Sequence, residues 1–318
     1  MSGPKPSQLD EFGEIARLFR PLTRGAPEAR GLLDDAAVIP GRAGHELVVT
    51  KDGMVAGVHF LPDDPPGIVA RKLMRANLSD LAAKAAEPFG YFLMTAWSSD
   101  YTLADRSAFA EGLALDGAAF DVSLLGGDTV STPGPMTLSM TMMGWAPLGA
   151  TVPRAGARVG DLVMVSGPIG DGWLAWGAAC GEIAGGWAPE AHRLPVPRLD
   201  LRAGLRAHAS AAADVSDGLV ADAGHIATAS GVGMSLDLDR MPLSPAGSSW
   251  LAAQPDRAAA LVRMATGGED FEIVCTASPA AAAALGLPVI GEVTARPAMS
   301  VRVGGAPVET GPGGWRHV

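Results

Sequence analysis

Two kinds of segment are missing from this chain of 318 residues: a disulfide framework and long hydrophobic runs. The only two cysteines, Cys180 and Cys275, are too few for a disulfide framework and lack the spacing of a zinc site. No run of about 18 uncharged apolar residues occurs, and the chain starts with acidic residues such as Asp10, Glu11 and Glu14 rather than a basic and then apolar segment. We therefore expect a cytoplasmic protein without a signal peptide or a membrane span.

Positive charge is also scarce. The chain has 24 basic and 34 acidic residues, which gives a formal net charge of −10. Nucleic-acid binders hold the phosphate backbone with clustered Lys and Arg, so we expect no nucleic-acid partner. If the ligand is an anion, cations must mediate its binding. The hydrophobic fraction of 48% supplies ample core material, and the length suits two α/β domains of ordinary size.

Lysine and asparagine are rarer than chance composition would give. Arginine supplies most of the basic residues, and the only lysines are Lys5, Lys51, Lys72 and Lys84. Asn77 is the only asparagine. We infer a GC-rich genome in which the codons for lysine and asparagine are rare. Each remaining lysine or asparagine is therefore a candidate for a functional residue. The alternative is that it survived by chance.

Hydrophobic spacing predicts the elements of the first half. Helical spacing predicts helices over residues 10–22, 68–86 and 103–119. Strands are predicted over residues 46–51, 121–125 and 136–142, the last from strict alternation of apolar and polar residues. The strand over residues 121–125 runs directly into Gly126-Gly127-Asp128.

A segment rich in Gly, Pro and Arg at residues 151–160 marks a junction, so we predict domains over residues 1–150 and 151–318. Strands and helices also alternate in the second half. Its predicted strands cover residues 161–166, 234–238, 271–276, 289–293 and 299–303, and its predicted helices cover residues 174–180 and 219–230.

Aspartates recur where strands are predicted to end or helices to begin. A single aspartate at such a place is usually a turn or helix-capping residue. Several of them at one sheet edge converge on the crevice where α/β proteins bind ligands. Because Mg²⁺ prefers oxygen ligands and is held by a few carboxylates plus substrate phosphates, the set suits a nucleoside triphosphate. Its members are Asp34, Asp35, Asp52, Asp128, Asp214 and Asp217.

Asp80 lies with Asn77 and Ser79 inside an otherwise apolar helix, where aspartate has a poor propensity. A carboxylate that is nearly buried there needs a partner. Lys72, Lys84 or a bound cation would supply it, and the neighbouring Asn77 favours the cation.

The usual phosphate-binding motifs are missing, since neither a P-loop, a dinucleotide-binding glycine motif nor a kinase catalytic loop is found. Gly126 and Gly127 either form a tight turn or let a phosphate approach the backbone closely. Arg154, in the glycine-rich junction, is either a phosphate-binding fork or a solvated loop residue.

Six ordered motifs together resemble the thiamine-monophosphate kinase family, which belongs to a superfamily with aminoimidazole ribonucleotide synthetase and selenophosphate synthetase. The resemblance covers nearly the whole chain. The motifs are residues 34–37 (DDAA), 55–60 (VAGVHF), 77–83 (NLSDLAA), 125–129 (LGGDT), 214–219 (DVSDGL) and 267–272 (GGEDFE).

The resemblance implies a two-domain aminoimidazole ribonucleotide synthetase-like α/β (α+β) fold. Its N-terminal domain has a mixed sheet with helices, binds ATP and Mg²⁺ and forms a homodimer through its sheet. Its C-terminal α/β domain completes the nucleotide and substrate site. The implied reaction is ATP-dependent phosphorylation of thiamine monophosphate to thiamine diphosphate by direct in-line transfer, assisted by several Mg²⁺ ions. No general base is implied, because the acceptor is an ionised phosphate.

The resemblance also implies roles for single residues. The magnesium ligands would be Asp35, Thr50, Asp52, Asp80, Asp128, Asp214 and Asp217, with Asp217 holding a further ion. The residues in contact with ATP would be Gly127, Asp128, Arg154 and Ser216. The residues in contact with thiamine monophosphate would be His59, Glu269 and Trp315, the last by stacking on an aromatic ring.

The chain departs from the family pattern at three places. Leu33 replaces the usual glycine, Lys84-Ala85 replaces Met-Gly, and Lys51 replaces a threonine that serves as a magnesium ligand beside Asp52. A protonated lysine has no lone pair to offer a metal. Lys51 therefore either turns away from the site or substitutes for one magnesium by pairing with Asp52 and reaching a phosphate. We adopt the second interpretation as a hypothesis because lysine is so rare in this chain.

Two other functions are possible interpretations. The nearer one is another enzyme of the same superfamily. Selenophosphate synthetases have a cysteine near their start and carbamoyl-dehydrating maturation enzymes end in cysteine, but this chain has neither. A nucleotide-binding regulatory protein, weakened as an enzyme by Lys51, is the alternative from a different class.

Overall fold

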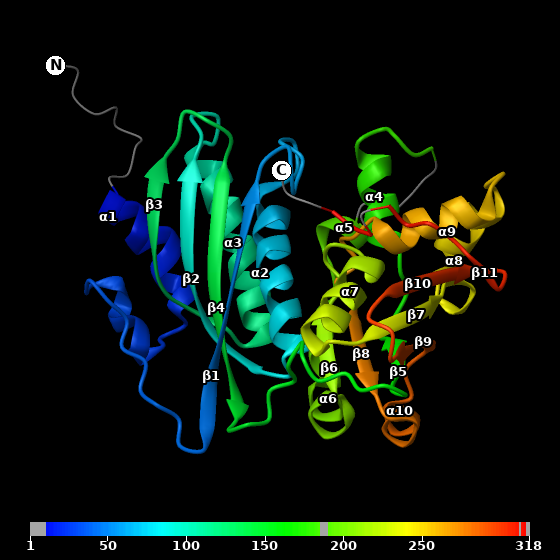
Figure 1. Cartoon of the computed structure of the whole chain (residues 1–318). Helices are drawn as coiled ribbons and strands as arrows, with labels where there is room; N and C mark the ends of the chain where they lie inside the picture. Colours follow the sequence, from blue (N-terminus) through cyan, green and yellow to red (C-terminus); the bar gives the residue numbers. More distant parts are fainter. Residues whose placement is uncertain (1–10, 185–189, 312, 316–318) are drawn as a thin grey trace. The chain divides into compact units, whose positions relative to one another are not determined.

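A computed structural model describes residues 11–184, 190–311 and 313–315 of the chain (Figure 1). The chain divides into two compact units. The N-terminal unit comprises Met1–Leu78 and Glu87–Leu148, and the C-terminal unit comprises Ser79–Ala86 and Gly149–Val318. The short segment Ser79–Ala86 thus belongs to the C-terminal unit although it lies within the first 150 residues.

The N-terminal unit is built on a mixed four-stranded sheet in the order β1-β4-β2-β3. Only β2 and β3 run parallel, and the other neighbours are antiparallel. The strands are β1 His45–Val55, β2 Glu87–Trp97, β3 Ser123–Ser131 and β4 Thr137–Pro147. Helices α2 Pro66–Ala83 and α3 Leu103–Phe120 lie along one face of the sheet (Figure 1). Four short turns precede β1, namely α1 Glu11–Glu14, the π-helical η1 Ile15–Phe19, and the 3-10 turns η2 Arg20–Thr23 and η3 Pro27–Leu32.

Local chemistry explains these elements. In the first half of β4, Leu138, Met140 and Met142 are fully buried, while the alternate residues are polar and partly exposed, so this part of the strand has one core face; from Met143 to Ala146 both faces are buried. Helix α3 begins with a capping box in which Thr102 and Asp105 satisfy each other's backbone N–H groups.

The C-terminal unit has a seven-stranded sheet in the order β11-β10-β7-β9-β5-β8-β6. The strands are β5 Leu162–Val165, β6 Ala211–Asp214, β7 Gly233–Asp237, β8 Ile273–Ala277, β9 Val289–Thr294, β10 Met299–Val303 and β11 Ala306–Pro307. The α-helices are α4 Asp171–Ala179, α5 Glu190–Arg193, α6 Arg202–His208, α7 Leu219–Ser230, α8 Pro245–Ala252, α9 Arg257–Thr266 and α10 Pro279–Leu285. Two further 3-10 turns are η4 Leu199–Leu201 and η5 Leu238–Arg240.

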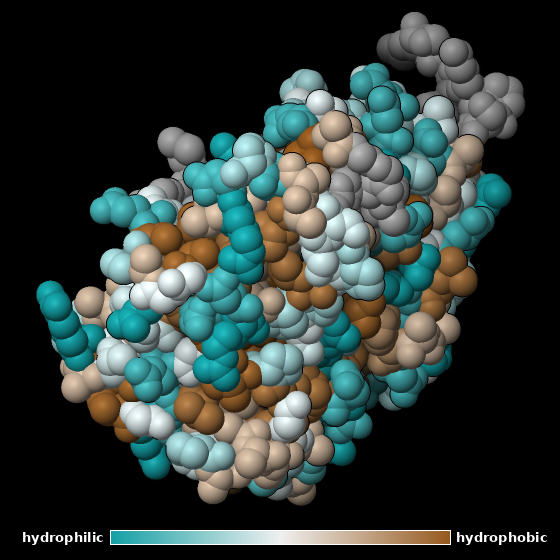
Figure 2. Space-filling model, turned by 90° about the vertical axis from the view of Figure 1, so that its right-hand side faces the viewer, coloured by the Kyte–Doolittle hydropathy of each residue, from teal (hydrophilic) through white to brown (hydrophobic). Residues whose placement is uncertain are grey.

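Alternate residues of the central strands feed two hydrophobic clusters. Val163 and Val165 of β5 pack in the larger cluster, together with side chains of α4, α7 and α9. Met164, between them in the sequence, packs in a second cluster with side chains of α6 and α10 and with the end of α2. The sheet is therefore covered on both faces. On the face drawn in Figure 2, hydrophilic and hydrophobic residues are interspersed.

Several predicted elements are confirmed. The helix over residues 219–230 and the strand over residues 299–303 have the predicted bounds, and α3 extends its prediction by one residue. The helix predicted over residues 10–22 is instead a series of short turns, one of which contains Pro21, and residue 10 lies outside the described residues. The prediction missed β2 entirely, although β2 is an interior strand of its sheet.

Two premises about the aspartates are wrong. Asp52 lies inside β1 and Asp128 inside β3, so neither follows a strand end. Gly126 and Gly127 are likewise strand residues and form no tight turn. Asp214, in contrast, is the last residue of β6, as predicted. Within the described ranges, the helices are too short or too polar to cross a lipid bilayer.

The two cysteines differ in reactivity. Cys275 lies fully buried in β8, where burial raises the pKa of its thiol to about 12, whereas Cys180 is exposed. Because the thiolate is the nucleophile, we expect Ellman's reagent at about pH 8 to titrate one thiol per folded chain and both after unfolding. Two thiols reacting at equal rates in the folded protein would contradict this assignment.

Candidate functional site

The residues implied as ligands fall into two sets, one in each unit. The N-terminal unit holds Asp35, Thr50, Lys51, Asp52, His59, Gly127 and Asp128. The C-terminal unit holds Asp80, Arg154, Asp214, Ser216, Asp217, Glu269 and Trp315. Asp80 lies in the first half of the sequence but belongs to the C-terminal unit, because the segment Ser79–Ala86 packs with that unit.

The register of the N-terminal sheet assigns its ligand candidates to faces. Gly53 pairs with Ser139, Ser139 with Met94, and Met94 with Asp128, so this row of side chains shares one face. Lys51, two residues before Gly53, shares that face, which lacks the helices. Thr50 and Asp52 occupy the opposite, partly buried face. Lys51 and Asp52 therefore extend from opposite sides of β1.

A cavity of about 520 Å³ lies over the open face of this sheet. Its polar lining includes three exposed carboxylates, Asp34, Asp35 and Asp128, together with Lys51. Its apolar wall includes Phe12, Ile15, Phe19, Leu32, Phe92 and Leu125. The cavity thus offers a ligand both charged groups and apolar side chains.

Gly127 has a structural reason to be glycine besides any ligand. A Cβ atom at this position would lie 2.0 Å from the carbonyl oxygen of Leu93 on the neighbouring β2 strand. The backbone of β3 is therefore pressed against β2 immediately before Asp128, which holds the Asp128 backbone in place at the cavity.

The VAGVHF motif forms a compact turn after β1 in the N-terminal unit. The backbone N–H of Val55 donates to Nδ1 of His59 (3.1 Å), which fixes the imidazole ring against the strand end. Lys72, which is only 1% exposed, donates from Nζ to the carbonyl oxygen of His59 (2.6 Å). One of the four lysines therefore holds the turn that carries a predicted substrate residue.

In the C-terminal unit, the DVSDGL motif forms the loop between β6 and α7. Three consecutive N–H groups, those of Ser216, Asp217 and Gly218, donate to a single oxygen, Oδ2 of Asp222, at 3.1, 3.2 and 3.2 Å. Burial and, to a smaller extent, the Asp217 carboxylate raise the pKa of Asp222 to about 7, although these N–H groups oppose the rise. Asp222 thereby ties the loop to the first turns of α7.

The same loop contacts both predicted substrate residues of this unit. The backbone N–H of Glu269 donates to the carbonyl of Ser216 (2.8 Å), and that of Trp315 donates to the carbonyl of Asp217 (2.9 Å). The Trp315 ring is 54% exposed and is available for stacking. Candidate residues for ATP, for metal and for substrate thus share one hydrogen-bonded loop system.

Lys84 lies one helical turn beyond Asp80. Its Nζ donates to the carbonyl oxygens of Ala212 (2.6 Å) and Val152 (3.3 Å), each two residues before a ligand candidate, Asp214 and Arg154. Burial and, to a smaller extent, Arg154 lower the pKa of Lys84 to about 8, although Asp214 and Asp80 oppose this shift. Lys84 stands where the family pattern has methionine. Its ammonium group therefore adds a positive charge that acts on three ligand candidates, Asp80, Arg154 and Asp214.

The GGEDFE motif holds a bent loop between α9 and β8. Gly268, Glu269 and Phe271 all have a positive φ, of 75°, 65° and 52°, a conformation that is unfavourable for the last two. A Cβ on Gly268 would lie 2.4 Å from the carbonyl oxygen of Ser216. This close approach explains why glycine occupies position 268.

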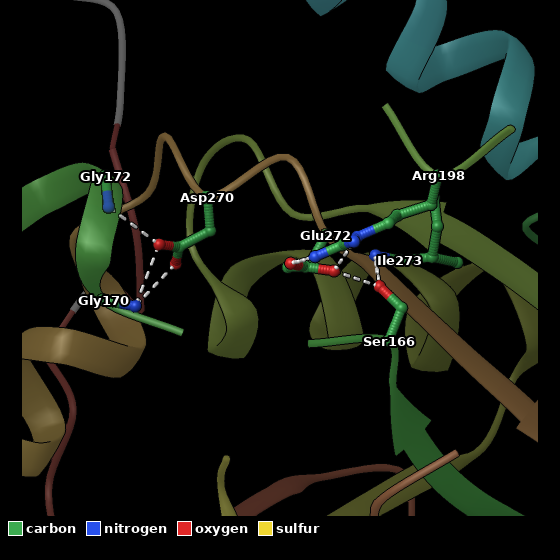
Figure 3. Close-up of polar contacts among 7 residues, drawn as sticks. All are labelled: Ser166, Gly170, Gly172, Arg198, Asp270, Glu272 and Ile273. Carbon is green, nitrogen blue, oxygen red and sulfur yellow. Dashed lines mark hydrogen bonds and ion pairs between the residues drawn. The ribbon is translucent and has the colours of Figure 1, made fainter. Parts of the chain in front are cut away.

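Two carboxylates anchor this loop (Figure 3). Asp270 accepts hydrogen bonds from the N–H groups of Gly170 (2.9 and 3.0 Å) and Gly172 (3.1 Å) at the start of α4. Glu272 forms a two-point ion pair with Arg198, including an Nε contact of 2.7 Å, and accepts from the hydroxyl of Ser166. Glu269, which directly precedes the first anchor, is thereby held in its strained conformation.

The carboxyl of Asp270 gives a test of this anchoring. Complete burial raises the pKa of this carboxyl well above its ordinary value of 3.8, although the hydrogen bonds from Gly170 and Gly172 favour the charged form. A carboxyl whose pKa is raised by folding stabilises the folded state while it is protonated, and that stability is lost as the pH rises through the raised value.

We therefore expect the free energy of unfolding of Asp270→Asn, relative to the unmodified protein, to increase between about pH 4.5 and about pH 8. The amide has no charge to desolvate at the higher pH. Urea denaturation at both pH values measures this difference, and a difference that does not change with pH would contradict the assignment.

Sequence reasoning missed three residues that shape the C-terminal set: Asp222, Asp270 and His192. Nδ1 of the buried His192 lies 3.1 Å from Oε2 of Glu269 and its ring packs against Trp176 at a centroid distance of 4.6 Å. Asp222 carried a weak signal, since acidic residues favour the first turn of any helix. Asp270 lies in the GGEDFE motif, but no local pattern marks its anchoring role, because its partners are about 100 residues away in the sequence. His192 carried no signal, because its partner is 77 residues away.

Comparison with known proteins gives matches over most of the chain. Residues 33–146 match the family model "AIR synthase related protein, N-terminal domain", and residues 158–304 match the corresponding C-terminal domain. A thiamine-monophosphate kinase of Caulobacter vibrioides is 53% identical over 99% of this chain and 93% of its own length.

Two solved structures are similar over nearly their full length. A thiamine-monophosphate kinase of Stenotrophomonas maltophilia K279a gives a TM-score of 0.78 at 34% identity, covering 94% of this chain and 98% of its own. AaThiL complexed with AMPPCP and TMP gives a TM-score of 0.78 at 27% identity, covering 100% of both chains.

Proposed function

This chain belongs to the thiamine-monophosphate kinase family, and on that premise we propose that it uses ATP to phosphorylate thiamine monophosphate to thiamine diphosphate. The predicted fold class is confirmed, since both domains match AIR synthase-related families and full-length structures. The related AaThiL has been solved with AMPPCP and TMP, which supports the same pair of substrates here.

The loop between β6 and α7 is the observation that carries the proposal beyond family membership. It presents Ser216 for ATP and Asp217 for a metal ion, and its carbonyls accept from the backbones of Glu269 and Trp315. In this proposal Glu269 and the exposed Trp315 ring contact the thiamine moiety. Positions that recognise the acceptor and the donor are thereby set by the same hydrogen bonds, as transfer between two bound phosphates requires.

We further propose that the cavity of the N-terminal unit takes the nucleotide. Its apolar wall suits the base, and its wall with Asp128 and Gly127 suits the phosphates and their cation. Arg154 is exposed and serves as a phosphate fork in the C-terminal unit. His59, fixed by Val55 and Lys72, is proposed to contact thiamine monophosphate.

The donor set fits magnesium. The candidate ligands are carboxylates and one hydroxyl, which are the oxygen donors that Mg²⁺ prefers. The proposed ligands are Asp35, Thr50, Asp52, Asp80, Asp128, Asp214 and Asp217. Bound magnesium neutralises phosphate charge and orients the transferring group. The side chains of the protein position the ions and substrates, and none of them is required as a general base.

Lys51 remains a proposed substitute for one ion. Since it extends into the cavity on the side of Asp128, we propose that its ammonium reaches a phosphate there; the pairing with Asp52 stays a prediction. Lys51→Thr, which restores the family residue, is expected to require a higher Mg²⁺ concentration for half-maximal rate. An unchanged Mg²⁺ dependence would mean that Lys51 takes no part in phosphate binding.

A homodimer through the N-terminal sheet is also proposed. Four large apolar side chains on the open face are 38–56% exposed, namely Leu47, Val49, Met94 and Val130. Such a row is costly in water and suits a second copy of the chain. Light scattering coupled to gel filtration is expected to give twice the chain mass, and a monomer at micromolar concentration would exclude the proposal.

We propose a cytoplasmic location, because one cysteine is buried as a free thiol in β8 and the similar proteins are bacterial thiamine-monophosphate kinases.

The decisive experiment couples ADP release to NADH oxidation in the presence of MgATP, with and without thiamine monophosphate. We expect ADP formation that depends on thiamine monophosphate, together with thiamine diphosphate detected as its fluorescent thiochrome. Unphosphorylated thiamine is the control acceptor and should not replace it. ATP binding without turnover would instead support the rival reading of a nucleotide-binding regulatory protein.

A further inference from the structure

The start of α7 carries a cluster that the proposed function does not use in full. One ligand atom from each of Asp217, Asp222 and His225 lies within 4.8 Å of the other two. Asp222 and His225 are three residues apart in α7, so they are neighbours on one face of the helix. Asp217 joins them from the loop that precedes the helix. Among the described residues this is the one group of three or more such side chains close enough together to hold a metal ion.

Asp222 is the buried member of the cluster. Only 3% of it is exposed, and its Oδ2 is saturated by the N–H groups of Ser216, Asp217 and Gly218. A ligand atom of the second carboxylate, Asp217, lies within 4.8 Å of one of Asp222, and a bound cation would offset the repulsion between the two negative charges.

The donor chemistry indicates which cation. Magnesium takes oxygen ligands, whereas an imidazole nitrogen added to carboxylates suits Zn²⁺ and related first-row ions. Three protein ligands with a position left for water is a common arrangement for such ions. We propose that Asp217, Asp222 and His225 form a binding site for a divalent first-row transition ion of the Zn²⁺ type.

This site differs from the magnesium sites implied by the family resemblance. Of these three residues, the resemblance assigned only Asp217 to an ion, and the structure places a buried carboxylate and an imidazole beside it. The three N–H groups that hold Oδ2 also fix the orientation of the carboxylate, so two of the three ligands are attached to one ordered loop. His225 is exposed and completes the site from the solvent side.

The test uses Zn²⁺ alone as the probe, on the full chain without nucleotide or thiamine monophosphate. Isothermal titration is carried out with Mg²⁺ in large excess, so that sites made only of oxygen are blocked. The background carries Cys180→Ser, because an exposed thiol binds Zn²⁺ adventitiously. We expect one Zn²⁺ per chain that Mg²⁺ does not displace.

His225→Gln is the informative variant, because an exposed helix residue is replaced without disturbing the core. We expect its affinity for Zn²⁺ to fall at least about tenfold. His208→Gln in α6 is the matched control, since it removes another helical histidine of the same unit and should leave the affinity unchanged. Replacing Zn²⁺ by Co²⁺ should give a visible d–d band in the unmodified site and in the control, and lose it in His225→Gln.

Two results would overturn the proposal: no Zn²⁺ binding in the presence of Mg²⁺, or binding that is equal in His225→Gln and the unmodified chain. Either result leaves the proposed kinase reaction untouched, because the titration contains no substrate. Conversely, a chain without kinase turnover that still binds one Zn²⁺ through His225 would refute the proposed function and keep the site.

Discussion

Asp128→Asn is expected to lower kcat/KM for the phosphorylation of thiamine monophosphate by roughly 10³-fold. Asp128 extends from the open face of the N-terminal sheet and lines the cavity, where it is exposed and has no role in the core. The amide keeps the size of the side chain but removes the negative charge that would hold magnesium beside the nucleotide phosphates. Phosphoryl transfer depends on such charge neutralisation and positioning, so the loss falls on turnover rather than on folding.

Asp121→Asn is the matched control for this variant. Asp121 is an exposed aspartate of the same unit, at the end of α3, with a φ of 56° that asparagine tolerates. We expect its kcat/KM to stay within about twofold of the unmodified enzyme, in line with the small effects of surface substitutions. Steady-state ADP release over a range of MgATP concentrations provides the comparison. If Asp128→Asn retains most of its activity, Asp128 is not a metal ligand.

Arg198→Met is expected to lower the free energy of unfolding by about 3 kcal/mol, the largest effect on stability among these predictions. Glu272 is only 5% exposed, and its two carboxylate oxygens are bound by Arg198 and by the hydroxyl of Ser166 (Figure 3). Removing the guanidinium leaves a buried negative charge with one neutral donor. The cost of that uncompensated charge exceeds the loss of the contacts themselves.

The double variant Arg198→Met with Glu272→Leu tests this physical reason. Replacing both members of a buried ion pair by apolar residues removes the desolvated charge, so we expect it to recover most of the lost stability. Arg257→Met is the control, because its ion pair with Asp239 is largely exposed and should be worth less than about 1 kcal/mol. Urea denaturation of the four proteins measures the differences. If Arg198→Met and the double variant lose the same free energy of unfolding, the loss comes from packing and not from an uncompensated charge.

The ion pair between Arg198 and Glu272 also affects the loop that carries Glu269. Asp270 and Glu272 follow the strained Glu269 in the chain, and Glu269 is proposed to contact the substrate. A loop with two positive-φ residues other than glycine keeps that shape only while its surroundings enforce it. The anchors that stabilise the C-terminal unit are therefore the ones that hold Glu269 beside Ser216.

Secondary structure followed from the sequence where the pattern was unambiguous. The alternation of Leu138, Met140 and Met142 predicted β4, and helical spacing predicted α3 and α7. β2 was missed because Pro88 and Gly90 resemble loop residues and the remainder is a continuous apolar run without a period. Such a run fits a strand with both neighbours present, and no local pattern reveals those neighbours.

The sequence by itself determined the kinds of group available: carboxylates for magnesium, few lysines, no thiol framework, and six motifs in the order of one enzyme family. It could not determine on which side of a strand each group lies or which distant segments meet. Only the tertiary structure placed Lys51 and Asp52 on opposite faces of β1, attached Lys84 to two carbonyls before Arg154 and Asp214, and joined Asp222 to three consecutive N–H groups. The physical reason is that motifs depend on neighbours in the chain, whereas burial, ion pairs and ligand clusters depend on neighbours in space.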